Sequence, residues 1–325
     1  MSFDQLIQLN AIEMIGDKAN LPTLEYFEQL DSLSHQLSLK NSKPFRVKKD
    51  RLEPTEQLYK LNEVVLKTQN SNAGVLLATI TEHTKVKKTS LNALNEIQSM
   101  LNQYKWFQPL SINQNIDKQQ IHIYLNALWN KTRGYNSTSD VERDNTHRDM
   151  LIKDQRTENS RMVSRLLTKH SKVHITKLMC SISITGSFPT TEISKIEKEI
   201  VKLKTIFISQ LQRLNQAKLF CIQWRIQRTL FGLYYLNVLV YHSVEHKLKV
   251  PQDNGMLTYN FDDTCSQAIS LYPQQNIQEI VIEKYVFQGI PFERWKVIFN
   301  NMLYPLKYYY YQSKTVSPKF SSVIY

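Results

Sequence analysis

A tyrosine and a lysine near the end of the chain have the types and the spacing that phosphoryl transfer could use. Tyr311 is the last of four consecutive tyrosines, and Lys314 follows it by three residues. A tyrosine hydroxyl can attack a phosphodiester and become covalently joined to the phosphate, while a nearby lysine stabilises charge on the oxygens. On a helix, residues three apart share a face. The pair is a candidate nucleophile with its assisting cation; alternatively, the four tyrosines simply cover the edge of a sheet.

A second pair, Tyr235 and Asn237, lies two residues apart in an expected strand, so both side chains point to one face. A metal ion held there would polarise a phosphate. However, neutral tyrosine is a poor ligand, and asparagine offers a carbonyl oxygen where imidazole would offer a nitrogen. Without a metal, DNA cleavage should be slower by several orders of magnitude. His242 and His246, joined by His174, are an alternative cation site if their segment is helical, although histidines at this spacing are common on surfaces.

The segment that must position these residues runs from 171 to 243. Apolar residues alternate from His174 to Ile184, which predicts a strand with one buried face. From Ile193 to Leu214 they recur every three or four residues, which predicts a helix of about six turns. Two more alternating runs, 218–227 and 233–241, predict an antiparallel hairpin. Because a strand face and a helix stripe must bury each other, the segment predicts an open α+β sheet with helices on one face.

From about Arg165 to the C-terminus, the order of these elements is similar to that of a known family. A short basic segment (168–173), a first strand, a long helix, a strand containing Trp224, a glycine turn, the strand with Tyr235-Leu236-Asn237, and finally Tyr311-Gln312-Ser313-Lys314 follow one another. This half of the chain resembles the YagK/YfjJ-type C-terminal domain of inovirus-type replication-initiation proteins, which is similar to His-hydrophobic-His endonucleases of rolling-circle replication.

The resemblance implies a site in which Tyr311 is the nucleophile, Lys314 and a second lysine, Lys319, assist, and Mg²⁺ or Mn²⁺ is required for activity. This sequence departs from the family pattern in two places. Tyr235 and Asn237 stand where the family has its histidine pair, and Gln227 stands where it tends to carry an acid. The metal-binding half of the site therefore looks degenerate, and the resemblance implies a DNA-binding protein that is catalytically impaired.

The charge of the chain supports a nucleic-acid partner. The formal net charge is +12; from residue 169 onward there are 19 Lys and Arg against 10 Asp and Glu, which leaves 22 against 19 before it. The basic excess thus lies in the half that resembles a DNA-processing domain. The candidate phosphate contacts are Lys172, Lys177, Arg225, Arg228, Lys307 and Lys319.

Three cysteines, Cys180, Cys221 and Cys265, are widely scattered. Two lie in expected strands, so buried free thiols are favoured over disulfides or a metal site. We find no apolar run long enough to span a membrane and no signal peptide, which favours a cytoplasmic protein without a membrane partner. No glycine-rich phosphate loop is present, which disfavours a nucleotide-driven enzyme.

The first 130 residues are expected to form a helical domain with helices around 6–15, 24–33, 55–68, 91–101 and 122–129. Two basic clusters, 43–51 and 85–88, lie between them and could be phosphate-contacting loops or merely solvated loops. Residues 131–165 are polar and of mixed charge, and are expected to be a linker or a mobile loop, with a short helix around 162–167 as an alternative at its end. After the core segment, a short helix is expected at 262–271, a strand at 277–287 and a helix that begins at Pro291.

The sequence thus predicts two domains, a helical one at 1–130 and a Rep-like α+β one at 166–325, joined by the linker. The expected function is that of a DNA-binding protein of the rolling-circle replication-initiator type, encoded by a phage or other mobile element, with single-stranded or hairpin DNA as its partner. The alternative is a structural or protein-interaction module whose positive charge is incidental. Affinity for DNA that falls steeply with salt would separate the two.

Overall fold

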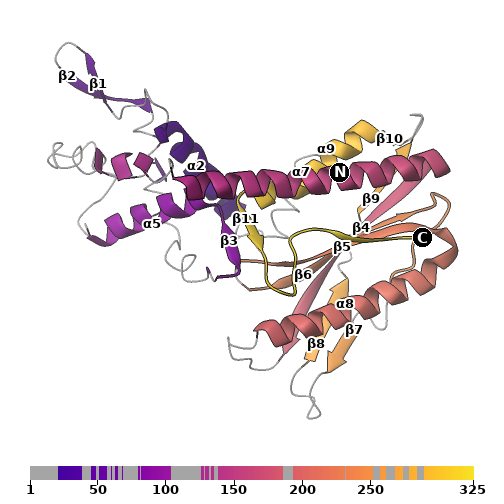
Figure 1. Cartoon of the computed structure of the whole chain (residues 1–325). Helices are drawn as coiled ribbons and strands as arrows, with labels where there is room; N and C mark the ends of the chain where they lie inside the picture. The colour runs from indigo at the N-terminus through magenta and orange to yellow at the C-terminus, as the bar shows by residue number, and fades with distance from the viewer. Residues whose placement is uncertain are drawn as a thin grey trace.

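The structure is a computed structural model of the chain. It describes residues 21–38, 45–48, 51–56, 82–103, 138–185, 193–230, 232–251, 257–260, 268–273, 278–283 and 289–325, with a few isolated residues between them. The expected first helix, around 6–15, lies outside these residues, as do most of the positions expected for the helices at 55–68 and 122–129. The described part is an α+β fold in which a mostly antiparallel sheet carries helices, as the sequence predicts (Figure 1).

The centre of the molecule is an eight-stranded sheet. Its strands are β4 (Lys172–Thr185), β5 (Leu219–Arg228), β6 (Tyr234–His242), β7 (Leu257–Asn260), β8 (Ala268–Pro273), β9 (Gln278–Glu283), β10 (Ile290–Pro291) and β12 (Ser321–Ile324). The main path runs in the order β10-β9-β4-β6-β5-β12, so β12 lies at an edge. On the side away from β6, β4 pairs with β9 along its first half and with β8 along its second.

The predicted strand and hairpin of the core segment are confirmed as β4, β5 and β6. Gly232, in the turn between β5 and β6, has a φ of 89°, a left-handed conformation that glycine adopts without steric cost. The expected strand at 277–287 is confirmed as β9, but residues 268–271 of the expected helix belong to β8 instead. The other residues of that expected helix, 262–267, lie outside the described part of the chain.

β4 is buried on both faces, whereas its sequence pattern predicted only one. Ile182 lies opposite Tyr234 in β6, whose hydroxyl reaches helix α8 (Ile193–Asn215). Ile175 lies opposite Tyr241, whose hydroxyl contacts helix α7 (Ser139–His170). The even-numbered face of β4 is therefore covered by α8, and the odd-numbered face by α7 together with α9 (Phe292–Leu303) (Figure 1). Odd positions are buried because helices cover both faces of the sheet, not one face as the sequence pattern predicted.

Helix α8 confirms the strongest helical pattern of the sequence. Its buried apolar residues recur at three- and four-residue steps and lie against the sheet; they are Ile196, Ile200, Leu203, Phe207, Ile208 and Leu211. Helix α9 likewise begins directly after Pro291, as expected, and ends at Leu303, shortly before Pro305. Proline fits the start of a helix because it lacks a backbone N–H that would find no partner there.

Helix α7 corrects the expected linker at 131–165. Residues 139–170 form one helix of 32 residues across the odd-numbered face of the sheet (Figure 1). Its buried stripe contains the polar residues Arg148, Gln155 and Asn159 among apolar ones. A stripe of this composition looks polar in the sequence, although it packs against β4, α9 and the N-terminal part of the chain. The helix joins the two expected domains in one continuous core.

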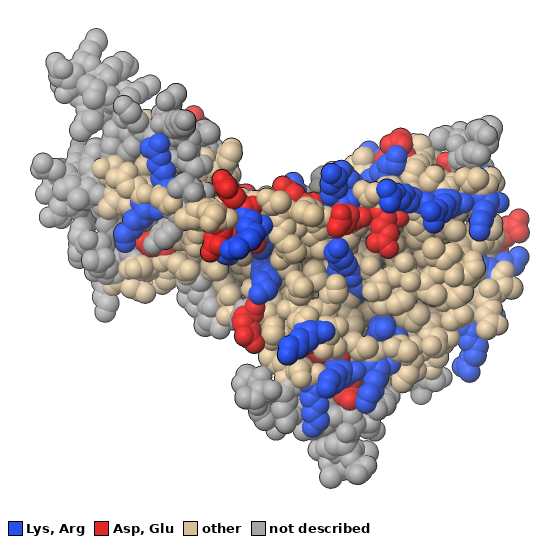
Figure 2. All heavy atoms as spheres, viewed as in Figure 1, with Lys and Arg blue, Asp and Glu red and all other residues tan. Residues whose placement is uncertain are grey.

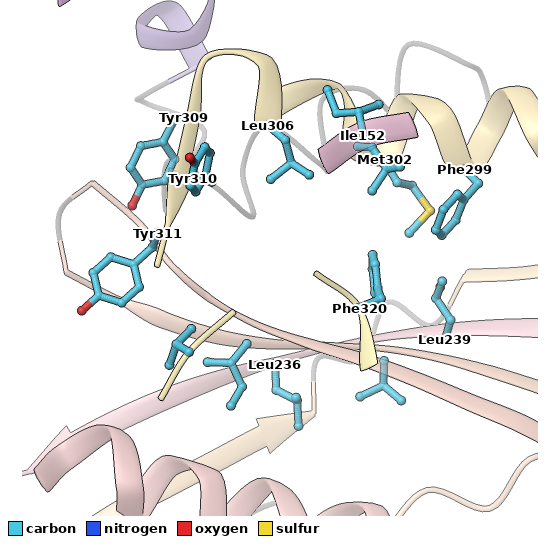
Figure 3. Close-up of a cluster of buried hydrophobic side chains, with 14 of the residues drawn as sticks. Ile152, Leu236, Leu239, Phe299, Met302, Leu306, Tyr309, Tyr310, Tyr311 and Phe320 are labelled. Carbon is cyan, nitrogen blue, oxygen red and sulfur yellow. The ribbon is translucent and has the colours of Figure 1, made fainter. Parts of the chain in front are cut away.

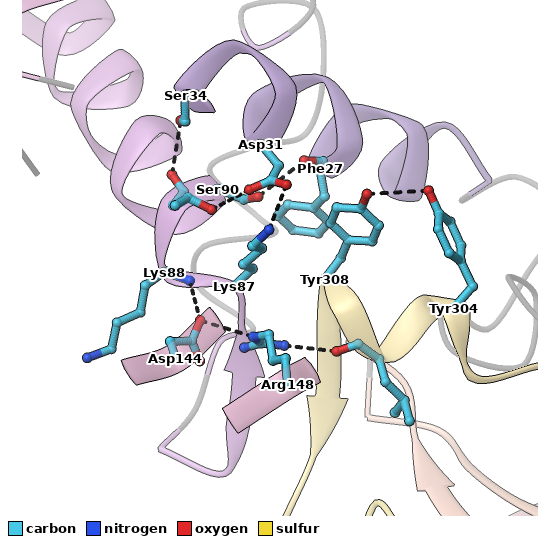
Figure 4. Close-up of polar contacts among 12 residues, drawn as sticks. Phe27, Asp31, Ser34, Lys87, Lys88, Ser90, Asp144, Arg148, Tyr304 and Tyr308 are labelled. Carbon is cyan, nitrogen blue, oxygen red and sulfur yellow. Dashed lines mark hydrogen bonds and ion pairs between the residues drawn. The ribbon is translucent and has the colours of Figure 1, made fainter. Parts of the chain in front are cut away.

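The N-terminal part contains helices α2 (Leu21–Ser38) and α5 (Lys88–Gln103), which confirm two of the expected helices. The basic clusters are not loops. The first forms the hairpin β1 (Phe45–Lys48) and β2 (Arg51–Pro54), and the second includes β3 (Thr84–Val86). Lys87 forms an ion pair with Asp31 at 2.7 Å and is largely buried, so it is not available to a phosphate (Figure 4).

Arg148 of α7 links the N-terminal part of the chain to the C-terminal segment through hydrogen bonds. One of its terminal nitrogens donates to the carbonyl oxygen of Leu306 and the other to that of Lys85, both at 3.1 Å. Its Nε donates to Asp144 at 3.0 Å, and Asp144 also accepts the backbone N–H of Lys88 at 2.9 Å (Figure 4). Three segments that are distant in sequence therefore meet at one buried guanidinium.

The C-terminal segment passes over the hairpin. After α9 come the short helix η5 (Tyr304–Lys307), strand β11 (Tyr309–Tyr311) and finally β12. Leu306, Met302 and Phe320 lie in a buried apolar cluster between α9 and the sheet, beside Ile152 of α7 (Figure 3). Among the described residues, no helix combines the length and the apolar character needed to cross a membrane.

Candidate functional site

Tyr311 lies in a strand, which corrects the expectation that it shares a helix face with Lys314. β11 pairs antiparallel with β3, with Tyr311 opposite Thr84. Side chains alternate along a strand, so Tyr309 and Tyr311 point to one side and Tyr310 to the other (Figure 3). Lys314 follows in a bend and is exposed, whereas Tyr311 is buried. The chain geometry does not bring the lysine and the tyrosine together in the way that a helix would.

The hydroxyl of Tyr311 is bound to a buried carboxylate. It donates to Oε1 of Glu197 on α8 at 2.7 Å. Tyr234 donates to the same oxygen at 3.1 Å, and Ser313 donates to Oε2 at 2.5 Å. Glu197 is 1% exposed. Three hydroxyl groups thus compensate one buried carboxylate, and they connect α8, the hairpin and the C-terminal segment.

This environment disfavours the nucleophilic form of Tyr311. Burial first, and then the hydrogen bond to Glu197, raise the pKa of Tyr311 well above its ordinary value. The pKa of Tyr234 is raised as well, chiefly by burial. The guanidinium of Arg228 lies over both rings, at 5.2 Å from that of Tyr311 and 5.5 Å from that of Tyr234. The positive charge of Arg228 lowers the pKa of both tyrosines, but by less than burial raises it. Tyr311 therefore remains a hydrogen-bond donor.

Tyr235 and Asn237 share a face, as expected, but that face is not open. Both are buried, with 8% and 1% exposure. The side-chain amide of Asn237 donates to the side-chain oxygen of Gln227 in the neighbouring strand β5. Tyr311 packs against Tyr234, with ring centroids 6.2 Å apart, and Tyr234 points to the opposite face of the sheet from Tyr235. Tyr311 therefore lies on one side of β6, and Tyr235 and Asn237 lie on the other.

The three candidate histidines do gather. The rings of His174 and His242 are 4.6 Å apart, and those of His242 and His246 are 5.9 Å apart. His242 nevertheless uses both of its ring nitrogens: Nδ1 contacts the carbonyl oxygen of Ser243 at 3.0 Å, and Nε2 contacts Oγ1 of Thr176 at 2.8 Å. His246 lies in a turn, not in a helix. In the described part of the chain, no group of three or more His, Cys, Asp or Glu is arranged to hold a metal ion.

The six candidate phosphate contacts do not form one surface. Lys177 and Arg225 are buried, and Arg225 lies 4.5 Å from the ring centroid of Phe320. Arg228 is half-buried between the tyrosine rings described above. Buried cations of this kind contribute to the fold and not to a surface that a phosphate backbone could reach.

The other three candidates are accessible but lie apart. Lys172 forms an ion pair with the buried Glu283 at 3.1 Å, and Lys307 is exposed beside Tyr304. Lys319 forms an ion pair with Asp154 of α7 at 3.4 Å, with both side chains about half exposed. Asp154, the ion-pair partner of Lys319, lines a surface feature that was not predicted from the sequence.

That feature is a groove between α7 and the edge strand β12. Its volume is about 650 Å³. The α7 wall carries Lys153, Asp154, Thr157, Glu158, Arg161, Met162 and Arg165; Gln223 lies at the base, and Ser322 and Ile324 form the other wall. The side chain of Gln223 is held in place by the protein interior. Its Oε1 accepts hydrogen bonds from Asn159 and Tyr241, both at 2.8 Å. The groove is therefore built on a rigid base at the open edge of the sheet.

The charge of the α7 wall changes along its length. Near the start of the groove, Lys153 is accompanied by Asp154 and Glu158. Beyond Glu158, α7 contains no acidic residue, and Arg161, Arg165 and Lys169 are exposed at four-residue steps. Residues at that spacing lie on one face of a helix, each about 6 Å along the axis from the last. We call Arg161, Arg165 and Lys169 the α7 basic row.

An aromatic pair lies next to the α7 basic row, at the C-terminal end of α7. The ring of His170 is stacked on that of Phe220, with centroids 3.8 Å apart and planes inclined by 10°. The backbone N–H of Tyr325 donates to the carbonyl oxygen of Phe220 at 3.0 Å, and Tyr325 is 43% exposed. The α7 basic row thus leads to a flat aromatic surface beside the last residues of the chain.

The sequence reasoning missed this groove because it treated residues 131–165 as a linker. A signal was available: between Glu158 and His170 the charged residues are all basic, at four-residue steps. Recognising a helix there would have placed them on one face. The chain as a whole matches no family model, no curated protein and no solved structure.

Proposed function

We propose that the chain is a nucleic-acid-binding protein that holds single-stranded DNA in the groove between α7 and β12 and does not cut it. The resemblance of its C-terminal half to replication-initiation proteins makes DNA of a phage or other mobile element the expected partner. The observation that carries the proposal is the α7 basic row, which flanks the groove and ends at a stacked aromatic pair.

The α7 basic row suits a phosphate backbone. Arg161, Arg165 and Lys169 add three positive charges within three turns, and α7 contributes no acid in that stretch. Positive side chains that contact phosphates displace condensed counterions, which provides most of the affinity for any nucleic acid. The guanidinium of arginine can in addition donate two parallel hydrogen bonds to one phosphate. A strand lying along the groove would therefore meet a cation at each turn of the helix.

The remaining surfaces of the groove suit unpaired bases. Proteins that bind single strands combine a positive groove with aromatic rings on which bases stack. Phe220 and His170 supply such a ring surface at the end of the α7 basic row, and Tyr325 is exposed beside it. The volume of about 650 Å³ is that of a small-ligand site, which accepts unpaired nucleotides but not the body of a duplex.

We expect no DNA cleavage, because the hydroxyl of Tyr311 is not available as a nucleophile. A nucleophile must reach the phosphate and lose its proton, yet this hydroxyl is buried and donates to Glu197. Tyr235 and Asn237 lie on the opposite face of the sheet, buried and away from Tyr311. Nicking would require the C-terminal segment to leave β3 and α8, which would expose the carboxylate that three hydroxyl groups now compensate.

Fluorescence anisotropy with a labelled single strand of mixed sequence tests the binding. We expect Arg161→Glu/Arg165→Glu/Lys169→Glu to weaken binding at least tenfold. Each phosphate contact contributes about −0.7 to the slope of log affinity against log salt for single strands, so the slope should become shallower by about 2. Lys131→Glu/Lys247→Glu/Lys249→Glu is the matched control, because it changes the net charge equally at exposed sites outside the groove.

Three results would contradict the proposal. Equal weakening by the control would mean that net charge, not the groove, attracts DNA. A plasmid nicked in the presence of Mg²⁺ or Mn²⁺ by the wild type but not by Tyr311→Phe would show that the protein is an endonuclease. Binding that does not change between low and moderate salt would favour a protein-interaction role instead.

A further inference from the structure

The base of the groove between α7 and β12 presents one end of a buried amide. Gln223 of β5 is 3% exposed and lines the groove. Its Oε1 already accepts hydrogen bonds from Nδ2 of Asn159 and from the hydroxyl of Tyr241, both at 2.8 Å. Its Nε2 has no hydrogen-bond partner in the part of the chain that the structure describes. An amide nitrogen can only donate, so Gln223 offers a donor to a molecule in the groove.

The orientation of this amide is set by a residue of α9. An indole N–H can only donate, and Nε1 of Trp295 donates to Oδ1 of Asn159 at 2.9 Å. The amide nitrogen of Asn159 must then face Gln223, where it donates to Oε1. A reversed Gln223 would place its nitrogen against that of Asn159, and neither nitrogen can accept a hydrogen bond. The network therefore holds the nitrogen of Gln223 toward the groove.

The walls beside this amide are apolar and suit the faces of a nucleic-acid base. Met162 of α7 lines one side of the groove, and Ile324 of β12, which is 55% exposed, lines the other. Ile324 lies two residues after Ser322, which is opposite Gln223 in the sheet, so all three side chains share a face. The hydroxyl of Ser322 can donate or accept, and it selects no base by itself. Unstacked bases are commonly held between apolar side chains and recognised by hydrogen bonds to their edges.

The α7 basic row determines which end of a base would reach the amide. Arg161 and Arg165 line the outer part of the groove. Figure 2 shows Lys and Arg along the C-terminal half of α7, beside a largely uncharged surface at the edge of the sheet. A nucleotide whose phosphate lies against these arginines enters the groove with its base inward. Its deepest atom is then opposite the glycosidic bond, where thymine and guanine carry a carbonyl oxygen, and cytosine and adenine carry an amino group.

We propose that Gln223 recognises a base of the bound strand and selects thymine or guanine over cytosine or adenine. This inference rests on the proposed function, because a strand must lie in the groove before a base can reach its floor. The amide nitrogen of Gln223 donates a hydrogen bond to the carbonyl oxygen of the base. An amino group at the same place would set donor against donor, and a buried donor without an acceptor is unfavourable. Asn159 and Trp295 are positioning residues that keep the donor end of Gln223 toward the groove.

Fluorescence anisotropy with two labelled homopolymers of equal length tests the preference. Thymine and 5-methylcytosine have the same ring and methyl group, and they differ only in the carbonyl or amino group and the ring nitrogen beside it. At mildly alkaline pH, the wild type should bind the thymine strand about fivefold more tightly, as one net hydrogen bond would provide. Gln223→Met removes the donor and should bring the two affinities within about twofold. Gln216→Met, at an exposed glutamine, is the matched control and should keep the preference.

Trp295→Phe tests the positioning of the amide. This change keeps an aromatic ring but removes the indole N–H, so that Asn159 and Gln223 can reverse together. The preference for thymine should fall at least to half, whereas a loss of packing alone would weaken the binding of both strands equally. A full preference in Trp295→Phe would overturn the positioning role. If Gln223→Met does not fold, Gln223→Glu is measured instead; its ionised carboxylate offers an acceptor to the groove, so the preference should reverse.

The outcomes separate this inference from the proposed function. If neither homopolymer binds, or if Arg161→Glu/Arg165→Glu/Lys169→Glu binds both as tightly as the wild type, the proposed function fails. If that variant weakens the binding of both homopolymers but the wild type binds them equally, only the inference about Gln223 fails. A preference for thymine that survives in Gln223→Met would assign the selection to another residue and would also overturn the inference.

Discussion

Tyr311 donates its hydroxyl hydrogen to Glu197 of α8 at 2.7 Å, and this bond links the C-terminal segment to the helix on the far side of the hairpin. A residue with the sequence context of a nucleophile is thereby a structural donor. The arrangement explains why its pKa is raised, because a phenolate would lie beside a carboxylate in a buried site. It also gives the residue a measurable role in stability.

Tyr311→Phe should therefore lower the free energy of unfolding without affecting DNA affinity. Glu197 would keep its bonds from Tyr234 and Ser313 but lose its shortest tyrosine donor, and removing one hydrogen bond from a buried charged group costs about 1–3 kcal/mol. Denaturant unfolding measures the change. Gln312→Ala, at the exposed neighbour, is the control and should change stability by less than about 0.5 kcal/mol. A Tyr311→Phe protein as stable as the wild type would show that the hydroxyl is not needed by the fold.

Arg148→Lys should be destabilising although it keeps the charge. The fork of arginine donates to the carbonyl oxygens of Leu306 and Lys85 at once, and a lysine cannot reach both in that geometry. We expect a loss of about 2–3 kcal/mol, since at least one of the two carbonyl groups would lose its donor. Arg143→Lys is the matched control on the same helix, because its side chain is 78% exposed. Equal effects of the two changes on the unfolding midpoint would contradict this role.

The elements that could be predicted from the sequence are those that bury apolar residues at a regular period. α8 and the even-numbered face of the β5–β6 hairpin follow this rule, because their core contacts are made mainly by isoleucine, leucine, valine and phenylalanine. α7 does not. Its stripe includes Arg148, Gln155 and Asn159, and each is tolerated only because a partner distant in sequence satisfies it. A local pattern cannot show such partners.

The candidate site was predictable only in part, for a related reason. The spacing in β6 correctly placed Tyr235 and Asn237 on one face, since strand alternation is local. That face is covered by α7, which the sequence presented as a linker, together with α9 and the C-terminal segment. Similarly, Tyr311 belongs to a strand because β11 pairs with β3, from the N-terminal part of the chain. Pairing between such distant segments leaves no periodic signal in either of them.

Asn159→Leu tests whether polar contacts beneath α7 hold the layers together. Nε1 of Trp295 on α9 donates to Asn159 Oδ1 at 2.9 Å, while Nδ2 donates to Gln223 and to Tyr241, both at 2.8 Å. Leucine has a similar branched shape, although it is larger, and it would leave the indole N–H without an acceptor. We expect a loss of about 2–3 kcal/mol of unfolding free energy. Asn102→Leu, on the exposed side of α5, is the control. Stability that is unchanged or higher in Asn159→Leu would mean that apolar packing alone suffices there.

The last prediction concerns acid sensitivity and His242. Burial lowers the pKa of His242 to about 4, against 6.5 for the unfolded chain. At pH values between these two, His242 binds a proton in the unfolded state but not in the folded state. The contribution of His242 to stability is therefore complete above pH 6.5. It is lost as the pH falls toward 4, by at most about 3 kcal/mol. His242→Gln should flatten the dependence of unfolding free energy on pH in that range, while His147→Gln, at an exposed site, should not. An unchanged slope in His242→Gln would assign the acid sensitivity to the carboxylates instead.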